Sequence, residues 1–334
     1  MTDATTPQPV DERWAARPDW NDDVTLLTWV KKPASASMDA TWGQRLEKSR
    51  FNLGYNAVDR HIIDGRIDEA ALVFGDETGA PSRTLSFAHL VQETGQFSGV
   101  LQALDTSAGQ NLLIAMPICA ESVIAYLGAL RLGVAVALID PTTADGQELR
   151  DVIQTQKSHV VLTSSSGGEG DPLTSVRSAL RDVEHQPLRS LVVQDESPAN
   201  PLGDDELAWA DIMKPGVVQP AGWRPLIGTV RHTPDASNDI PRWSATLAVA
   251  LRGAFTGQSQ AEEATNGAWC WAHGGDWSQA ALMNVLVPML SGVPAVVCAT
   301  AVGTWSDAIR REVSATIGRP LYAAHPEGVW PLNP

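Results

Sequence analysis

The segment from residue 225 to residue 251 contains a polar stretch that could contact a nucleotide phosphate. It reads PLIGTVRHTPDASNDIPRWSATLAVAL: an apolar, strand-like start, a polar loop over residues 231–242 and a helix-like apolar run. A loop between a strand and a helix binds phosphate through backbone N–H groups that glycine torsions bring close, usually with a lysine. Residues 231–242 contain neither glycine nor lysine. The position suits a nucleotide-binding loop, whereas the composition does not.

A second candidate is the glycine-rich stretch SSSGGEGD at residues 164–171, which follows a strand-like run. Glycine and serine after a strand can wrap backbone N–H groups around a phosphate. The phosphate loop of nucleotide hydrolases has the form GxxxxGK[ST], and no lysine follows here. We therefore interpret 164–171 as a connecting loop.

Other pairs of chemically active side chains have simpler interpretations. Cys270 and His273 lie three residues apart, but GAWCWAH reads as a strand that runs into a glycine turn. The turn separates the two side chains, so no metal site is expected. Asp59 and His61 have no nucleophile nearby in the sequence, and we interpret them as part of a solvated helix face.

The composition is that of a globular protein with a strongly acidic balance. The 334 residues are 43% hydrophobic, and 39 acidic against 24 basic residues give a formal net charge of -15. This charge repels phosphate, which disfavours nucleic acid and membranes as partners. Three widely spaced cysteines without a CxxC pair, no signal pattern and no apolar run of membrane-spanning length predict a cytoplasmic protein.

Short β-branched runs alternate with helical patterns in the first half of the chain, which predicts an α/β fold. AALVF (70–74) and RTLSF (83–87) read as a hairpin, and a helix over 87–104 follows it. A second helix is expected over 121–133, where Gly133 ends it. Continuous apolar runs predict buried parallel strands at NLLIAMP (111–117), VAVALID (134–140) and HVVLTS (159–164).

The pattern restarts after a loop-rich region, so we expect two lobes, each a parallel sheet with flanking helices, the second one incomplete. Further strands are expected at 190–194, 225–230, 267–272 and 294–300, and further helices at 243–256, 277–291 and 305–316. The expected division is a disordered or arm-like segment at 1–20, a first α/β lobe at 21–195, a linker with a short helix at 196–224 and a partial second lobe at 225–334.

These segments, in this order, resemble the N-terminal domain of the AMP-forming acetyl- and propionyl-CoA synthetases of the adenylate-forming superfamily. The resemblance covers roughly residues 20–300 and rests on FNLGYNAVDRHIIDGRIDEAALVF, NLLIAMPICAESVIAYLGALRLGVAVALID, PLIGTV, GAWCWAHGGDW and PMLSGVPAVVCAT. It implies a domain of two similar parallel-sheet lobes. It also implies an acid–CoA ligase ancestry, with ATP, Mg and CoA as the family's ligands.

The resemblance places residues 231–240 where the family has the loop TSGSTGKPKG. Every glycine and both lysines of that form are replaced, and the polar positions are Arg231, His232, Thr233, Asp235, Ser237 and Asp239. Two aspartates oppose a triphosphate, since like charges ~4 Å apart cost about 1 kcal/mol in water and more when partly buried. We therefore expect a degenerate phosphate loop, no bound ATP, Mg or CoA, and no catalytic residue.

Two other functional segments of the family are also altered. The family segment WCxADxGWxTGHS is represented by Trp269 and Trp277, with His273 in place of the aspartate, and we interpret these three residues as a remnant of the acyl pocket. The family's arginines for the CoA phosphate follow the strand equivalent to HVVLTS. There, SSSGGEGD supplies an acid and no base.

The chain reaches Pro334 without the family's adenine motif, its ribose-binding aspartate or the C-terminal domain that carries the adenylation lysine. We expect a truncated, catalytically degenerate homologue, inactive alone, that serves as a binding or regulatory module. One half of a split AMP-forming acid–CoA ligase and a gene remnant are the alternatives.

A partner is expected to bind the region after Gly267. The partner would be a second copy, a full-length acyl-CoA synthetase or a complementary half, and the contact would use an exposed apolar patch around 293–298 and 321–324. The alternative is that residues 301–334 fold back and cover this sheet edge.

Overall fold

The structure is a computed structural model. It describes residues 53–76, 78–142, 144–165, 171–183, 190–194, 200–216, 268–271, 285–298, 305–319, 321–325 and 328–331. The expectations for the segment 1–20, for the strand at 225–230 and for the helix at 243–256 lie outside these residues.

A five-stranded, wholly parallel sheet forms the first half of the fold, in the order β4-β3-β5-β6-β7. Its strands are β3 (Asn111–Ala115), β4 (Ala135–Ile139), β5 (Val160–Thr163), β6 (Ser190–Val193) and β7 (Glu206–Ala208). The four strands predicted between residues 111 and 194 are confirmed. β7 is an additional strand inside the predicted linker, and the short helix expected there follows it as α9 (Trp209–Ile212).

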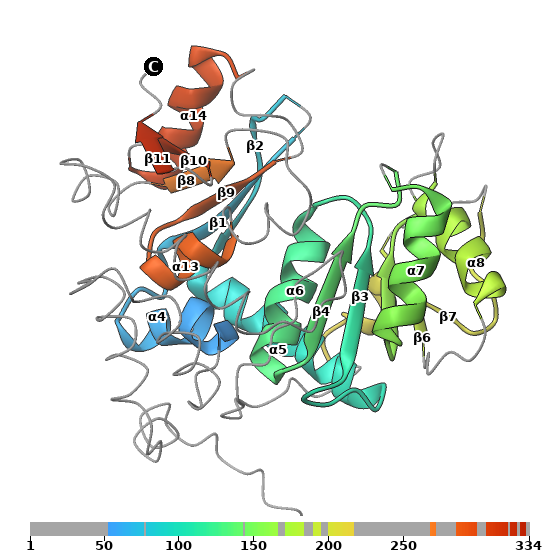
Figure 1. Ribbon diagram of the computed structural model, residues 1–334. Helices are drawn as coiled ribbons and strands as arrows, with labels where there is room; N and C mark the ends of the chain where they lie inside the picture. Colours follow the sequence, from blue (N-terminus) through green and yellow to red (C-terminus); the bar gives the residue numbers. More distant parts are fainter. Residues whose placement is uncertain are drawn as a thin grey trace, which may run out of the picture.

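Two pairs of helices cover the faces of this sheet (Figure 1). They are α5 (Phe87–Ala103) with α6 (Ala120–Leu132), and α7 (Gly146–Gln156) with α8 (Pro172–Asp182). Along β3, Leu112 and Ile114 belong to the core beneath α5 and α6, whereas Leu113 belongs to the core beneath α7 and α8. The alternation follows from the two-residue period of a strand, and burial on both faces explains the continuous apolar runs.

The predicted helices over 87–104 and 121–133 are confirmed as α5 and α6. Ser86 caps α5 by accepting a hydrogen bond from His89 N. Gly133 ends α6 at a φ of 77°, a left-handed conformation that glycine adopts without a steric penalty.

A six-stranded sheet, in the order β11-β10-β8-β9-β1-β2, combines strands from distant parts of the chain. Its strands are β1 (Ala70–Gly75), β2 (Pro81–Ser86), β8 (Ala268–Trp271), β9 (Ala295–Val297), β10 (Leu321–His325) and β11 (Gly328–Pro331). β1–β2 and β10–β11 are antiparallel hairpins, and the other neighbours are parallel. The hairpin and the strands predicted at 267–272 and 294–300 are confirmed.

The two sheets do not follow the order of the lobes along the sequence. The β1–β2 hairpin lies inside the segment 21–195 but pairs through β1 with β9, in the sheet that contains the C-terminal strands. In Figure 1 this sheet lies at the upper left, and the five-stranded sheet lies at the lower right. Strand pairing over a long sequence separation thus decides which sheet the hairpin joins.

One continuous hydrophobic core joins the two sheets. Leu72 of β1 and Val297 of β9 pack in the same core as α5, α6 and the short helix α13 (Val287–Ser291). On the other face of the six-stranded sheet, Val73 and Val296 pack with Trp305 and with α14 (Asp307–Ile317). α14 confirms the helix predicted over 305–316, whereas only the end of the helix predicted over 277–291 is described.

The exposed apolar patch predicted around residues 293–298 is wrong. Val293, Ala295, Val296 and Val297 are each at most 2% exposed, because β9 lies between β1 and β8 and packs against helices on both faces. The other part of the predicted patch, 321–324, forms β10 and pairs with β8 along its length. The segment after residue 300 therefore covers the edge of β8.

Candidate functional site

The structure describes the backbone of one predicted site residue. Trp269 lies in β8, where it pairs with Tyr322 of β10 and Ala295 of β9. His273 and Trp277 of the expected acyl-pocket remnant lie outside the described residues. The same holds for every residue of the expected phosphate loop, namely Arg231, His232, Thr233, Asp235, Ser237 and Asp239. Both sites stay predictions.

The carboxyl edge of the five-stranded sheet is the described place where a fold of this kind would bind a ligand. The chain passes from β3 to β4 on one side and then to β5 on the other side of β3. The loops after β3 and β5 therefore leave the edge in opposite directions. In open α/β sheets, ligands bind in the crevice at such a reversal of strand order. The predicted loop 164–171 begins at this point.

Buried polar groups lie at this edge. Thr163 Oγ1 donates a hydrogen bond to Ala115 O at 2.8 Å, which ties the ends of β5 and β3 together. Ser165 is 3% exposed, and its Oγ has no hydrogen-bond partner. A buried hydroxyl without a partner costs free energy, so a water molecule or a ligand group at this edge would be stabilised by Ser165.

The first turn of α6 lies at the same edge and is capped by Cys119. Its backbone N–H donates to Ser122 Oγ at 2.9 Å. Burial raises the pKa of the Cys119 thiol to about 11, so the sulfur is protonated near neutral pH and is a poor nucleophile. The contact with Ser122 makes Cys119 the capping residue of α6.

A carboxylate of the chain itself occupies the first turn of α6. Glu121 accepts hydrogen bonds from Arg83 Nη1 of β2 at 3.3 Å and from Gln194 Nε2 at 3.3 Å. Arg83 also pairs with Glu93 of α5 at 3.0 Å, so this chain of contacts links the two sheets. A helix N-terminus attracts anions, and here Glu121 already takes that place. A phosphate approaching α6 would meet its negative charge.

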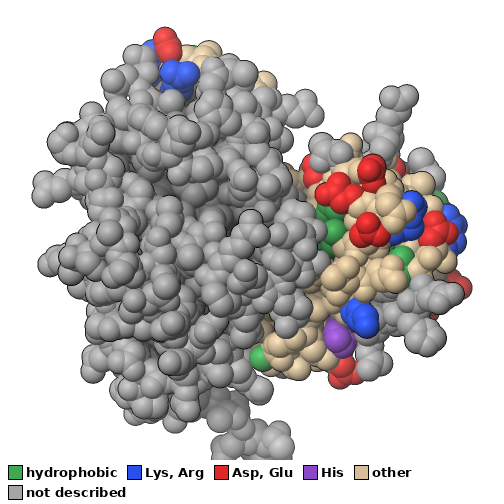
Figure 2. Space-filling view, in the orientation of Figure 1, with side chains coloured by type: hydrophobic (Ala, Val, Ile, Leu, Met, Phe, Trp, Pro, Cys, Tyr) green, Lys and Arg blue, Asp and Glu red, His purple; other side chains and the backbone are tan. Residues whose placement is uncertain are grey.

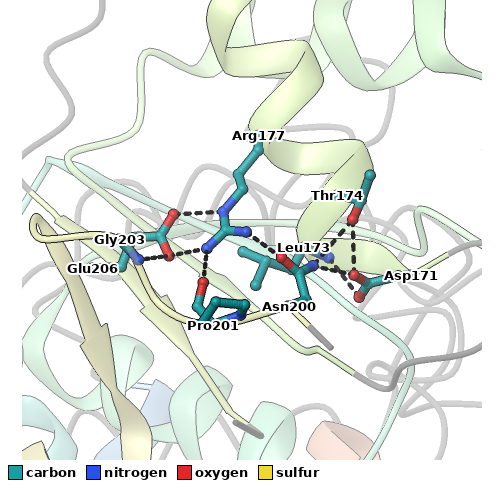
Figure 3. A network of polar contacts seen from close by, with 8 residues as sticks. All are labelled: Asp171, Leu173, Thr174, Arg177, Asn200, Pro201, Gly203 and Glu206. Carbon is teal, nitrogen blue, oxygen red and sulfur yellow. Dashed lines mark hydrogen bonds and ion pairs between the residues drawn. The ribbon is translucent and has the colours of Figure 1, made fainter. Parts of the chain in front are cut away.

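Arg177, the first arginine after β5, is engaged in a polar network between α8 and β7 (Figure 3). Its Nε donates to Glu206 Oε1 at 2.8 Å and its Nη2 to Glu206 Oε2 at 2.5 Å, while Nη1 donates to Asn200 Oδ1. The hydrogen bond from Arg177 lowers the pKa of Glu206. Asn200 in turn donates to Asp171, the N-cap of α8. This bidentate pair leaves Arg177 little capacity to hold a phosphate.

Part of the described surface is acidic. Acidic side chains gather over the α7 and α8 side of the face shown in Figure 2.

Within the described ranges, no group of three or more His, Cys, Asp or Glu side chains could hold a metal ion. None of the described helices is long and apolar enough to cross a membrane.

A comparison with protein families identifies the chain. A family model described as AMP-binding enzyme matches residues 60–239, which is more than half of the chain. The chain belongs to the AMP-binding enzyme family. The match begins at α4 (Arg60–Ile63) and includes the whole five-stranded sheet.

Acyl-CoA synthetases are among the relatives of this AMP-binding domain. An acetyl-coenzyme A synthetase of Streptomyces coelicolor is 27% identical over 222 residues, which are 65% of this chain and 32% of the relative. The mitochondrial acyl-CoA synthetase short-chain family member 3 of Rattus norvegicus is 28% identical over 49% of this chain and 26% of the relative. The chain thus spans about a third or less of the length of these relatives.

Solved structures show the same fold. The acetoacetyl-CoA synthetase from Streptomyces lividans superposes with a TM-score of 0.60 and 16% identity, over 82% of this chain and 42% of that chain. An acyl-CoA synthetase from Brucella canis gives a TM-score of 0.56 and 17% identity, over 82% of this chain and 47% of that chain. The α/β fold expected from the sequence, like that of acyl-CoA synthetase N-terminal domains, is confirmed.

The sequence interpretation of Asp59 and His61 as solvated is wrong. Their side chains are buried, with residue exposures of 2% and 1%. Asp59 pairs with Arg131 of α6, and His61 contacts Met289 O of α13. The sequence did indicate this burial, because NAVDRHII and LGALRLG each place charged side chains inside an apolar run. Charges at such positions are buried as pairs.

Proposed function

We propose that this AMP-binding domain has lost adenylation and serves as a binding or regulatory module related to the acyl-CoA synthetases. The observation that carries the proposal is the composition of residues 231–240, RHTPDASNDI. The family match ends at residue 239, inside this stretch. Without glycine the backbone cannot approach a triphosphate closely, Pro234 removes one N–H donor, and Asp235 and Asp239 repel the phosphates.

Energetics make this loss decisive for the reaction. Adenylation relies on positioned donors and cations around a phosphoryl centre, and the loss of one such donor commonly costs about 2.7–4 kcal/mol. Several donors are missing together in this loop. The expected turnover with ATP is therefore too slow to measure.

The carboxyl edge of the five-stranded sheet and the polar network between α8 and β7 support the same proposal for CoA. Glu121 occupies the N-terminus of α6, and Arg177 is held by Glu206. Two described features that could attract a phosphate, the N-terminus of α6 and Arg177, are thus already paired with a carboxylate. We propose that the domain does not hold the CoA phosphate at this edge.

A second candidate function is one half of a split AMP-forming acid–CoA ligase. It is favoured by the share of the relatives that the chain spans, which is 32% for the Streptomyces coelicolor acetyl-coenzyme A synthetase. In this case the chain is inactive alone and regains carboxylate-dependent pyrophosphate exchange when the complementary polypeptide is added. An exchange assay with and without that polypeptide distinguishes the two functions.

The primary test compares ATP binding by the parent chain and by a loop-graft variant. The variant replaces residues 231–240 with TSGSTGKPKG, and a matched control replaces the same residues with the parental ten in scrambled order. Calorimetric titration with Mg-ATP should show no binding to the parent or to the scrambled control, and binding to the graft. Pyrophosphate exchange by the parent with acetate or propionate, lost in Arg231→Ala or His232→Ala, would overturn the proposal.

As a binding module the domain needs a partner. We propose a second copy, a full-length acyl-CoA synthetase or a complementary half, docked on the region after Gly267. β11 is the outermost strand of the six-stranded sheet in this region, and an outer strand can pair with another chain. Light scattering alone and after mixing with an acetyl-CoA synthetase tests the contact. A mass equal to one chain in the first experiment, and only the separate masses of the two proteins in the second, would contradict it.

A further inference from the structure

The amino edge of the five-stranded sheet contains three buried polar atoms without a hydrogen-bond partner among the described residues. They are Asn111 Oδ1, Ser158 Oγ and His159 Nδ1. Asn111 begins β3, whereas Ser158 and His159 directly precede β5. The backbone N–H of His159 donates to Asn111 O at 2.9 Å, so these two residues lie side by side. We call Asn111, Ser158 and His159 the amino-edge cluster.

The cluster lies where α7 returns the chain to the sheet. α7 ends at Gln156, whose backbone O accepts a hydrogen bond from Asn111 Nδ2. A backbone carbonyl only accepts, so this contact turns the amide nitrogen of Asn111 toward α7 and leaves Oδ1 as a buried acceptor. Ser158 is 2% exposed, so its hydroxyl is also shielded from the bulk solvent.

The contacts of Gln110 determine where His159 carries its proton. Gln110 Oε1 accepts a hydrogen bond from the backbone N–H of Ser107 at 2.6 Å, so the other end of this amide, Nε2, is the donor. Gln110 Nε2 lies 3.0 Å from His159 Nε2, which must therefore accept. A neutral imidazole with an accepting Nε2 has its proton on Nδ1. Nδ1 of His159 is thus a buried donor.

A buried donor and a buried acceptor on neighbouring residues can be satisfied by one bridging molecule. Each costs free energy while it has no partner. Two hydrogen bonds of about 2.8 Å that meet at one oxygen atom span roughly 4.5 Å, close to the ~4.8 Å between adjacent strands. A cation would be repelled by the N–H of His159, and an anion by Asn111 Oδ1. The cluster therefore suits a small neutral molecule that both donates and accepts.

We infer that the amino-edge cluster is an internal hydration site, in which one ordered water molecule accepts from His159 Nδ1 and donates to Asn111 Oδ1. Buried waters in proteins typically bind about three polar groups that lack other partners. The hydroxyl of Ser158, next to His159 in the chain, can donate or accept and is the third such group here. The water joins the start of β3 to the connection between α7 and β5, independently of the proposed function.

The position of the proton on His159 is the first test. The full chain is labelled with ¹⁵N in its seven histidines, and proton–nitrogen correlation spectra are recorded at about pH 8, above the ordinary titration range of histidine. His159→Gln identifies the signals of this ring by their loss. We expect the proton on Nδ1. A proton on Nε2 would overturn the inference, because Nδ1 would then not be a donor.

Gln110→Glu tests the residue that sets this tautomer. A carboxylate only accepts, so the proton of His159 should move from Nδ1 to Nε2 in this variant. Gln154→Glu is the matched control: it introduces the same charge at an exposed position of α7 and should leave the proton on Nδ1. The inference fails if the proton stays on Nδ1 in Gln110→Glu, or if the control moves it as well.

A crystal structure of the parent chain tests the water itself and does not depend on any variant. We expect a water oxygen within about 2.7–3.2 Å of both Asn111 Oδ1 and His159 Nδ1. A protein group bonded to either atom in place of the water would refute the site. The same holds for a map that shows ordered waters around neighbouring residues and none between these two atoms.

Discussion

The ion pair between Asp59 and Arg131 is buried, and its loss should destabilise the fold strongly. Arg131 Nε donates to both carboxylate oxygens of Asp59 at 3.0 Å, and Nη2 donates to Oδ1 at 2.6 Å. The side chains are 2% and 9% exposed. Gly54 lies so close to the backbone of Arg131 that a Cβ there would be 2.3 Å from its nitrogen, which leaves little room for rearrangement.

The perturbation is Asp59→Ala, which leaves the guanidinium of Arg131 buried without its counter-charge. Breaking a buried pair from one side costs about 3–5 kcal/mol, chiefly through desolvation of the remaining charge. We expect the free energy of unfolding to fall by about this amount in urea titrations followed by far-ultraviolet circular dichroism. The double variant Asp59→Leu with Arg131→Met should lose less than Asp59→Ala alone, because no charge stays buried.

An exposed pair supplies the matched control. Lys214 Nζ lies 2.5 Å from Asp211 Oδ1, but the side chains are 63% and 65% exposed. Lys214→Ala should therefore cost less than about 1 kcal/mol. The reasoning fails if Asp59→Ala lowers the free energy of unfolding no more than Lys214→Ala does. It also fails if the double variant is as unstable as Asp59→Ala, because burial would then not determine how strongly this pair stabilises the fold.

Four further outcomes are expected. Lys157→Gly should stabilise the fold by about 0.5–1 kcal/mol in urea titrations, because Lys157 ends α7 at a φ of 47°. Gly79→Ala should lower the melting temperature in calorimetry, since its Cβ would lie 2.3 Å from Trp305 Nε1. Burial raises the pKa of the Cys119 thiol from 9.0 to about 11, so iodoacetamide should alkylate this thiol about a hundredfold more slowly in the folded chain than in the unfolded chain. The same shift makes the stabilisation that the buried thiol contributes complete below pH 9.0, and this stabilisation should disappear as the pH rises through about 11. A version ending at Thr300 should aggregate in light scattering, because it lacks α14, β10 and β11.

Local features of the chain were readable from the sequence. The continuous apolar runs at β3, β4 and β5 predicted buried parallel strands, and the glycine after α6 predicted the end of that helix. These features depend on neighbouring residues, whose periodicity and backbone torsions act over one or two turns. The composition of residues 231–240 is equally local, and the expectation of a degenerate phosphate loop needs no tertiary structure.

Charged residues showed where local reasoning fails. Asp59 and His61 read as a polar helix face, because the partners that bury them, Arg131 and Met289, lie far away in the sequence. The same limit applies to Arg177, whose capacity to bind a phosphate is taken up by Glu206 across the gap between α8 and β7. A side chain's type predicts its chemistry, but its partner determines whether that chemistry is available.

The sequence by itself determined the α/β class, the extent of most strands and helices and the absence of glycine and lysine from residues 231–242. Only the tertiary structure decided that the β1–β2 hairpin joins the six-stranded sheet, that β9 is buried and that β10 covers the edge of β8. An alternation of apolar residues indicates that a strand has a buried face. It does not indicate which strand lies beside it, because any strand of similar length and pattern could take that place. The choice among them is made by the packing of the whole core, in which β1, β9, α13 and α6 must fit together at once.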